Sequence, residues 1–245
     1  WAPTIPGLPA EASVSDVVTD ETNTVYLFDQ ARFRDTYGVE ETATVRAALA
    51  RLTGDGAQGD DVVGAVLAID SDPGVAAARS ILDANSCSLT AREALSTAVN
   101  AYVAAALGDH RDQIDSVVIV GGDDIVPFAP VAQHTGQFNE ASHSDALRLS
   151  GDACTLAVPE GSLDPCATPL SAAAATNHIL TDDPYGLATA YRSLGGYLYV
   201  PNAALGRLVE TPEQIVATID RFIEADGVLE ADSSLTGGYG AWAEL

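Results

Sequence analysis

The chain has 245 residues, 47% of them hydrophobic, which is enough to bury a core as one large domain. It carries 35 acidic residues against 11 basic ones, all arginine, for a net charge of −24. This balance excludes a basic surface for nucleic acid and disfavours anionic membranes, since both need clustered cations. No apolar run approaches the ~18 residues of a membrane-spanning helix.

Residues 1–22 are predicted to form an extended, acidic lead-in. The sequence contains no methionine, so Trp1 is not a translational start. The proline-rich stretch from Trp1 to Pro9 is typical of a segment exposed by processing, such as removal of a signal peptide. We therefore expect an exported protein, found outside the cell or on its surface.

Residues 23–245 are predicted to form one α/β domain with an irregular insertion around 129–195. Apolar runs predict strands, and apolar positions at helical spacing predict helices that begin at caps such as Asp72, Thr90 and Thr211. The predicted strands are 24–28, 62–69, 117–120 and 196–200, with another beginning at 235; the predicted helices are 42–52, 73–85, 90–107 and 211–225. Continuous apolar strands alternating with helices indicate a mainly parallel sheet covered by helices on both faces.

The two loops that follow Val120 and Val200 are the first candidate sites. Functional sites of parallel sheets lie beyond the carboxyl ends of the strands. The segment Gly121-Gly122-Asp123-Asp124 follows the strongest predicted strand. Its glycines permit a sharp turn, whereas its two carboxylates would repel phosphate. Gly122, Asp123 and Asp124 are therefore candidate site-lining residues, either as a structural turn or as groups that orient a catalytic or substrate group.

Asp182 and Asp183 form a second carboxylate pair, placed before a rigid Pro184 turn. Adjacent oxygen donors are weak candidate ligands for Ca²⁺, although a dedicated calcium loop has more widely spaced ligands. The alternatives are a role in capping or in the turn, or a place in the site lining. No cofactor is required by any motif in the sequence.

The four histidines and three cysteines do not predict a catalytic dyad. None of the histidines lies in a glycine-flanked turn after an apolar strand, and there is no Gly-x-Ser-x-Gly elbow of a serine hydrolase. Cys154 and Cys166 flank an 11-residue loop of turn formers, which predicts a disulfide and an oxidising compartment. Cys87 lies outside that pair, in a polar segment after a helix, and is expected to be a free thiol that packs as a small residue.

Three segments, in order, resemble the gingipain family of cysteine peptidases. Residues 117–128 resemble its strand and Gly-Asp turn followed by proline, residues 181–186 its Thr-Asp…Tyr-Gly segment, and residues 200–213 its Gly-Arg-Leu segment followed by a helix. The similarity spans roughly residues 24–242. It implies a caspase-like α/β/α sandwich and thiol-dependent endopeptidase activity on proteins or peptides.

The resemblance also implies an incomplete domain. The family's catalytic histidine and cysteine follow later strands, so we expect both beyond this chain and expect the chain alone to be inactive. Asn202 occupies the position that orients the histidine, where the family usually has an acidic residue, and Arg207 is expected to be a structural anchor. The remainder of the parent polypeptide or another copy would complete the sheet. The alternative function is a non-catalytic caspase-like scaffold in a larger surface protein.

Overall fold

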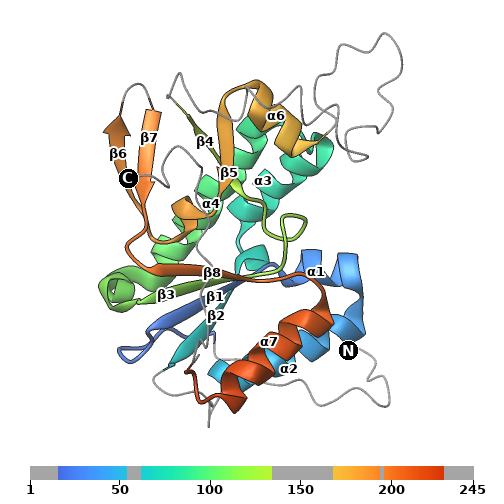
Figure 1. The fold of residues 1–245 in the computed structure, drawn as a ribbon, viewed down its shortest axis with the longest axis vertical. Coiled ribbons are helices and arrows are strands. Elements are labelled where there is room, and N and C mark those ends of the chain that lie inside the picture. Colours follow the sequence, from blue (N-terminus) through green and yellow to red (C-terminus); the bar gives the residue numbers. More distant parts are fainter. Residues whose placement is uncertain (1–15, 54–61, 134–167, 194–195, 229–245) are drawn as a thin grey trace, which may run out of the picture.

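The computed structural model describes residues 16–53, 62–133, 168–193 and 196–228, and its centre is a four-stranded parallel sheet (Figure 1). The strand order in this sheet is β2-β1-β3-β8. The strands of the described residues are β1 (Thr24–Phe28), β2 (Gly64–Ala68), β3 (Ser116–Val120), β4 (Ala129–Ala132), β5 (His178–Thr181), β6 (Thr189–Ser193), β7 (Gly196–Val200) and β8 (Ala204–Leu208). The predicted fold class, a parallel α/β sandwich, is confirmed.

Helices cover both faces of this sheet (Figure 1). Helices α1, α2 and α7 pack together on one face, and α3 and α4 pack together on the other. The helices are α1 (Gln30–Tyr37), α2 (Val39–Thr53), α3 (Pro73–Ala84), α4 (Leu89–Leu107), α6 (Pro169–Ala175) and α7 (Pro212–Glu224), with short 3₁₀ turns η1 (Ile69–Ser71), η2 (Gly108–Gln113) and η4 (Asp183–Tyr185). No helix of the described residues is long and apolar enough to cross a bilayer.

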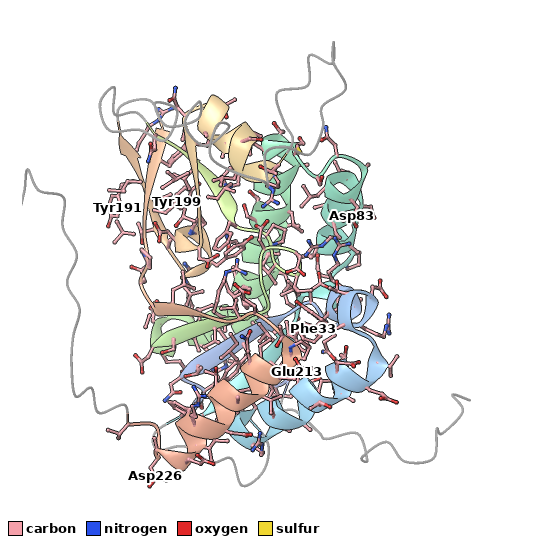
Figure 2. The ribbon with its side chains drawn as sticks, turned by 45° about the vertical axis from the view of Figure 1, so that its right-hand side comes forward. Phe33, Asp83, Tyr191, Tyr199, Glu213 and Asp226 are labelled. Atoms are coloured by element: carbon pink, nitrogen blue, oxygen red, sulfur yellow. The ribbon has the colours of Figure 1, made fainter. Side chains whose placement is uncertain are left out.

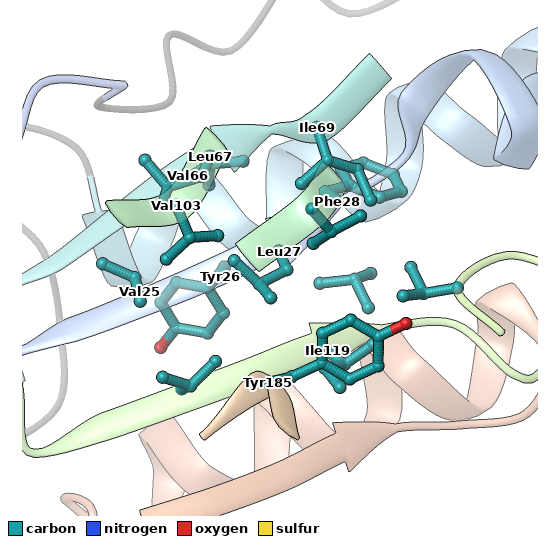
Figure 3. Packing of buried hydrophobic residues seen from close by; sticks show 14 of the residues in the cluster. Val25, Tyr26, Leu27, Phe28, Val66, Leu67, Ile69, Val103, Ile119 and Tyr185 are labelled. Carbon is teal, nitrogen blue, oxygen red and sulfur yellow. The ribbon is translucent and has the colours of Figure 1, made fainter. Parts of the chain in front are cut away.

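Strand β1 is the centre of the core because all five of its residues are buried. It pairs in parallel with β2 on one side and with β3 on the other. Phe28 packs edge to face against Phe33 of α1, with ring centroids 5.2 Å apart. Figure 3 shows the resulting cluster, in which Tyr26, Leu27 and Ile119 lie between the two helical layers.

Side-chain caps set the start of the main helices, as their sequences indicate. Asp72 accepts a hydrogen bond from the Val75 N–H at the start of α3, and Thr211 forms a capping box with Gln214 at the start of α7. The predicted cap of α4 was wrong. The helix begins at Leu89, and Ser88 rather than Thr90 accepts the bond from the Ala91 N–H.

The fourth strand of the parallel sheet is β8, and not the predicted strand 196–200. That predicted strand is β7, which pairs antiparallel with β6 in a separate hairpin. Figure 2 shows Tyr191 and Tyr199 on this hairpin, where Tyr191 is exposed. The segment between β3 and β8 also contributes the antiparallel pair β4–β5 and the short helix α6.

Candidate functional site

A cavity of about 790 Å³ opens at the carboxyl edge of the parallel sheet. Strands β1 and β3 are neighbours, but the chain continues from β1 to β2 on one side and from β3 to β8 on the other. The loops that follow β1 and β3 therefore diverge, which is where open α/β sheets form their binding crevices. The lining includes Arg32 after β1, Gly122 to Asp124 after β3, and Val209 and Glu210 after β8.

The turn after β3 is held by Gly121, whose φ of +106° is open to glycine and strained for other residues. A Cβ at Gly121 would lie 2.7 Å from Cβ of Ile125, which is fully buried. The Gly121 N–H donates to the Leu208 carbonyl at 2.9 Å, so the turn is joined to the end of β8. This geometry brings Asp123 and Asp124 to the cavity, as the sequence predicted for the loop after Val120.

Asp123 is held by a buried arginine of α4. Arg92, only 5% exposed, donates from both terminal nitrogens to the two carboxylate oxygens of Asp123, at 2.7 and 2.9 Å. The Phe128 N–H donates to the same carboxylate at 2.8 Å. Burial acts to raise the pKa of Asp123, but the bonds from Arg92 and Phe128 and the charges of Arg92 and Arg207 together hold that pKa below its ordinary value.

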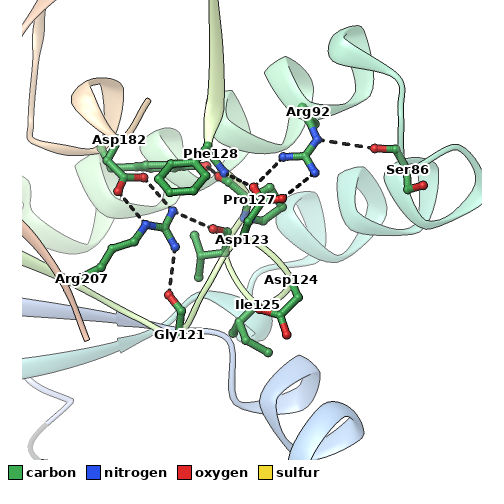
Figure 4. Close-up of polar contacts among 12 residues, drawn as sticks. Ser86, Arg92, Gly121, Asp123, Asp124, Ile125, Pro127, Phe128, Asp182 and Arg207 are labelled. Atoms are coloured by element: carbon green, nitrogen blue, oxygen red, sulfur yellow. Dashed lines mark hydrogen bonds and ion pairs between the residues drawn. The ribbon is translucent and has the colours of Figure 1, made fainter. Parts of the chain in front are cut away.

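Arg207 of β8 joins three segments of the chain (Figure 4). Its guanidinium donates to both oxygens of Asp182, at 2.6 and 2.7 Å, and to the carbonyls of Gly121 and Val126, at 2.9 and 2.8 Å. It also lies 4.2 Å from the centroid of the Phe128 ring. The side chain is 8% exposed, so Arg207 is an internal anchor and not a free cation.

Arg79 of α3 connects the ends of β1 and β3. Its Nη2 donates to Asp29 Oδ2 at 2.8 Å and to the Ile125 carbonyl at 2.7 Å. Asp29 is the first residue after β1, and its side chain is 5% exposed. Burial raises the pKa of Asp29 above its ordinary value, although the Arg32 backbone N–H and the charge of Arg79 act in the other direction.

Two carboxylates of the cavity have no ion-pair partner among the described residues. These are Asp124, which is exposed, and Glu210. Both lie near Tyr37, whose hydroxyl donates to the Glu210 carbonyl at 3.2 Å. Burial, together with the negative charges of Asp124 and Glu210, raises the pKa of Tyr37.

Asn202 lies at the opposite edge of the sheet. It is in the loop between β7 and β8, and the register pairs the first residue of β8, Ala204, with the first residue of β3. Its Nδ2 donates to the Leu187 carbonyl at 2.7 Å and to Thr189 Oγ1 at 2.9 Å. The structure therefore separates Asn202 from the cavity, because the loop after Val200 does not leave the carboxyl edge of the parallel sheet.

The structure shows different local roles for Asp182 and Asp183. Asp182 directs both oxygens to Arg207, so those oxygens are engaged by a cation of the protein itself. Asp183 begins the short η4 turn, which agrees with the alternative of a role in the turn. Within the part of the chain that the structure describes, no group of three or more His, Cys, Asp or Glu side chains could hold a metal ion. The calcium site stays a prediction that this geometry does not support.

The cavity lining, as far as the described residues form it, includes no histidine and no cysteine. His110 Nδ1 lies 3.4 Å from Asp20, and His178 Nδ1 lies 2.9 Å from the Thr176 carbonyl. Cys87, before α4, is not the free thiol that the sequence predicted, because it has an interaction partner. The predicted Cys154–Cys166 disulfide, as well as His134 and His143, lies outside the described residues.

The arginines of the helices were missed by the sequence analysis, although a signal was present. Arg92 is followed at helical spacing by Leu95, Ser96 and Val99, and all four are buried. An arginine within an apolar stripe needs a buried carboxylate partner. That requirement connects Arg92 to a carboxylate-rich strand end such as the one after β3.

Comparisons with known proteins give no relative of this chain. No protein family matches it, and neither a curated protein nor a solved structure matches it.

We expect the replacement Asp123→Asn to lower the free energy of unfolding by about 2 kcal/mol at pH 7, since a hydrogen-bonded charge is lost beside Arg92. The pKa of Asp123 is depressed in the folded state, so its stabilisation is complete above the unfolded value of about 4 and is lost as the pH falls through the folded value. Urea unfolding of both proteins between pH 7 and the acid limit measures this. The difference between them should shrink at acid pH, and a constant difference contradicts the prediction.

Proposed function

We propose that this chain is the amino-terminal part of a gingipain-like cysteine peptidase domain of an exported protein. The cavity at the carboxyl edge forms part of the substrate cleft. The catalytic histidine and cysteine come from a part of the parent polypeptide beyond these residues. The substrate is a protein or peptide, and the remainder of the parent polypeptide completes the sheet.

The observation that carries this proposal is the position of Arg207. The three segments that resemble the gingipain family are separate in sequence, yet Arg207 from the third binds Asp182 of the second and the carbonyls of Gly121 and Val126 of the first. Segments that form one structural unit support a resemblance better than three unrelated matches would. The unit also lies against a cavity at the switch point of a parallel sheet, which is the usual place for a site in such folds.

Two observations favour a second candidate, a non-catalytic scaffold. Three arginines of the site are bound to carboxylates of the protein itself, in the pairs Arg79–Asp29, Arg92–Asp123 and Arg207–Asp182. Such pairs fix the loops after β1 and β3. In addition, Asn202 lies away from the cavity, so it cannot orient a histidine there without a rearrangement.

Labelling of the parent polypeptide with peptidyl acyloxymethyl ketones tests the two candidates. These electrophiles alkylate the thiolate of an active cysteine peptidase, and they should be used as a set with arginine, lysine, phenylalanine or leucine before the reactive ketone. We expect labelling of the longer polypeptide at a cysteine beyond Leu245, and no labelling of the 245-residue chain.

Two outcomes contradict the proposal in different ways. Labelling of Cys87, Cys154 or Cys166 would show that the nucleophile lies within this chain. An unlabelled parent polypeptide, with reduced thiols confirmed by maleimide reaction after unfolding, would favour the scaffold.

A further inference from the structure

The surface of the cavity offers apolar contacts between its charged pairs. Leu82 of α3, Pro127 and Phe128 of the loop after β3, and Val209 after β8 all line it. They come from three parts of the chain and from both sides of the sheet's carboxyl edge. Its volume of about 790 Å³ is within the usual range for ligand sites, which combine an apolar lining with a few polar groups.

Three guanidinium groups of the cavity's inner wall, those of Arg79, Arg92 and Arg207, are already paired with carboxylates of the protein. Arg92 and Arg207 each form a two-bond pair with a carboxylate, and Arg79 pairs with the buried Asp29. A ligand anion would have to compete with these carboxylates, because removing one partner of a buried pair leaves an uncompensated charge. The inner wall therefore does not select for an acidic ligand.

Arg79 nevertheless has donors to spare. Both of its hydrogen bonds to the protein leave from Nη2, so Nη1 is not bound by any described residue, and the side chain lines the cavity and is 12% exposed. Since Asp29 already balances the charge, the group best suited to the remaining donors is a neutral acceptor. The carbonyl oxygen of a peptide bond is such an acceptor.

We propose that the cavity accepts an uncharged apolar side chain of a peptide, while Arg79 donates to a main-chain carbonyl of the same peptide. This assignment rests on the proposed function and names its substrate class. The side chain packs on Leu82, Pro127, Phe128 and Val209. The competing class is a basic side chain, since Asp124 and Glu210 lie in the cavity without ion-pair partners among the described residues.

Binding of capped amino acids to the 245-residue chain tests the assignment. The probes are the N-acetyl methylamides of phenylalanine, leucine, arginine and glutamate, followed by amide chemical shifts at Gly122 to Asp124 in low and high salt. We expect the phenylalanine and leucine probes to bind at least about tenfold more tightly than the charged probes, with no dependence on salt. Tighter binding of the arginine probe, weakened by salt, would overturn the assignment, as would the absence of shifts with all four probes.

Two matched variants place the bound side chain. Val209 lines the cavity and is 41% exposed, whereas Ile81 of α3 is 60% exposed and is not among the lining residues, so neither replacement should unfold the chain. Val209→Asn should weaken binding of the phenylalanine probe about fivefold, and Ile81→Asn should leave it unchanged. Equal effects of the two variants contradict the placement.

The role of Arg79 has its own test. Toluene, which has no carbonyl, should bind more weakly than the phenylalanine probe; equal binding contradicts the role of Arg79.

The two proposals can fail separately. If the phenylalanine probe binds but the parent polypeptide is not labelled by any ketone, the peptidase is wrong and the binding site stands. If the parent polypeptide is labelled only by the ketones with arginine or lysine, the peptidase stands and the apolar assignment is wrong.

Discussion

Replacing Arg207 with methionine is expected to lower the free energy of unfolding by about 4 kcal/mol, the largest effect of any single replacement considered. The change removes two bonds to Asp182 and two bonds to the carbonyls of Gly121 and Val126. It leaves Asp182, whose side chain is 17% exposed, as a carboxylate without its counter-charge. Breaking a buried pair from one side costs about 3 to 5 kcal/mol because of that uncompensated charge.

Urea unfolding followed by circular dichroism measures this loss, with two further variants as controls. Arg207→Lys keeps the positive charge but loses the planar guanidinium group with its several donors, so it should lower the free energy of unfolding by about half as much as Arg207→Met. Arg192→Met alters an exposed arginine of β6 and should change stability by less than about 0.5 kcal/mol. If Arg207→Met lost no more than Arg192→Met, Arg207 would not be the anchor of the three segments.

The centre of the sheet could be predicted because its signals are local. Strands β1 and β3 are continuous apolar runs, and the starts of α3 and α7 are marked by Asp72 and Thr211. These features arise from burial and capping within a few residues, so a single sequence contains them.

Strand β8 could not be predicted in the same way. Its sequence, Ala-Leu-Gly-Arg-Leu, contains a glycine and a charged residue, and only β3 pairs with it among the described strands. The neighbouring Gly-Tyr-Leu-Tyr-Val of β7 has far stronger strand formers, yet it pairs with β6. The choice between them depends on partners distant in sequence, such as Asp182 for Arg207. The same limit explains why the loop after Val200 was predicted as a candidate site, whereas the role of Asn202 was implied by the resemblance alone.

One wall of the cavity follows a strand that is recognisable in the sequence. Gly122, Asp123 and Asp124 line the cavity as expected for a loop after a parallel strand. The opposite wall comes from α1, α3 and the first turn of α4, whose arginines were not assigned any role. Helical arginines usually face solvent, and only the carboxylates Asp29 and Asp123, which they bind, explain why Arg79 and Arg92 do not.

Replacing Gly121 with alanine is expected to lower the free energy of unfolding by about 3 kcal/mol, from two causes that act together. At a φ of +106° a side chain strains the backbone, which costs of order 1 to 2 kcal/mol. The new Cβ would also lie 2.7 Å from Cβ and 2.8 Å from Cγ1 of Ile125, a buried residue with no room to withdraw. The Ile125 carbonyl accepts a hydrogen bond from Arg79, so the same change should also disturb the cavity wall.

Two other glycine-to-alanine replacements separate these causes by urea unfolding. Gly64 of β2 has no positive φ, but its Cβ would lie 2.8 Å from the Tyr26 ring, so Gly64→Ala measures crowding without backbone strain. Gly206 of β8 has neither problem, since nothing lies within 4 Å of its Cβ position. Gly206→Ala should therefore stabilise the chain by about 0.5 kcal/mol, because alanine loses less conformational freedom than glycine on folding. The expected order of stability is Gly206→Ala above the unaltered chain, then Gly64→Ala, then Gly121→Ala. If Gly121→Ala were as stable as Gly206→Ala, Gly121 would not have the positive φ and the close contact with Ile125 described for the turn after β3.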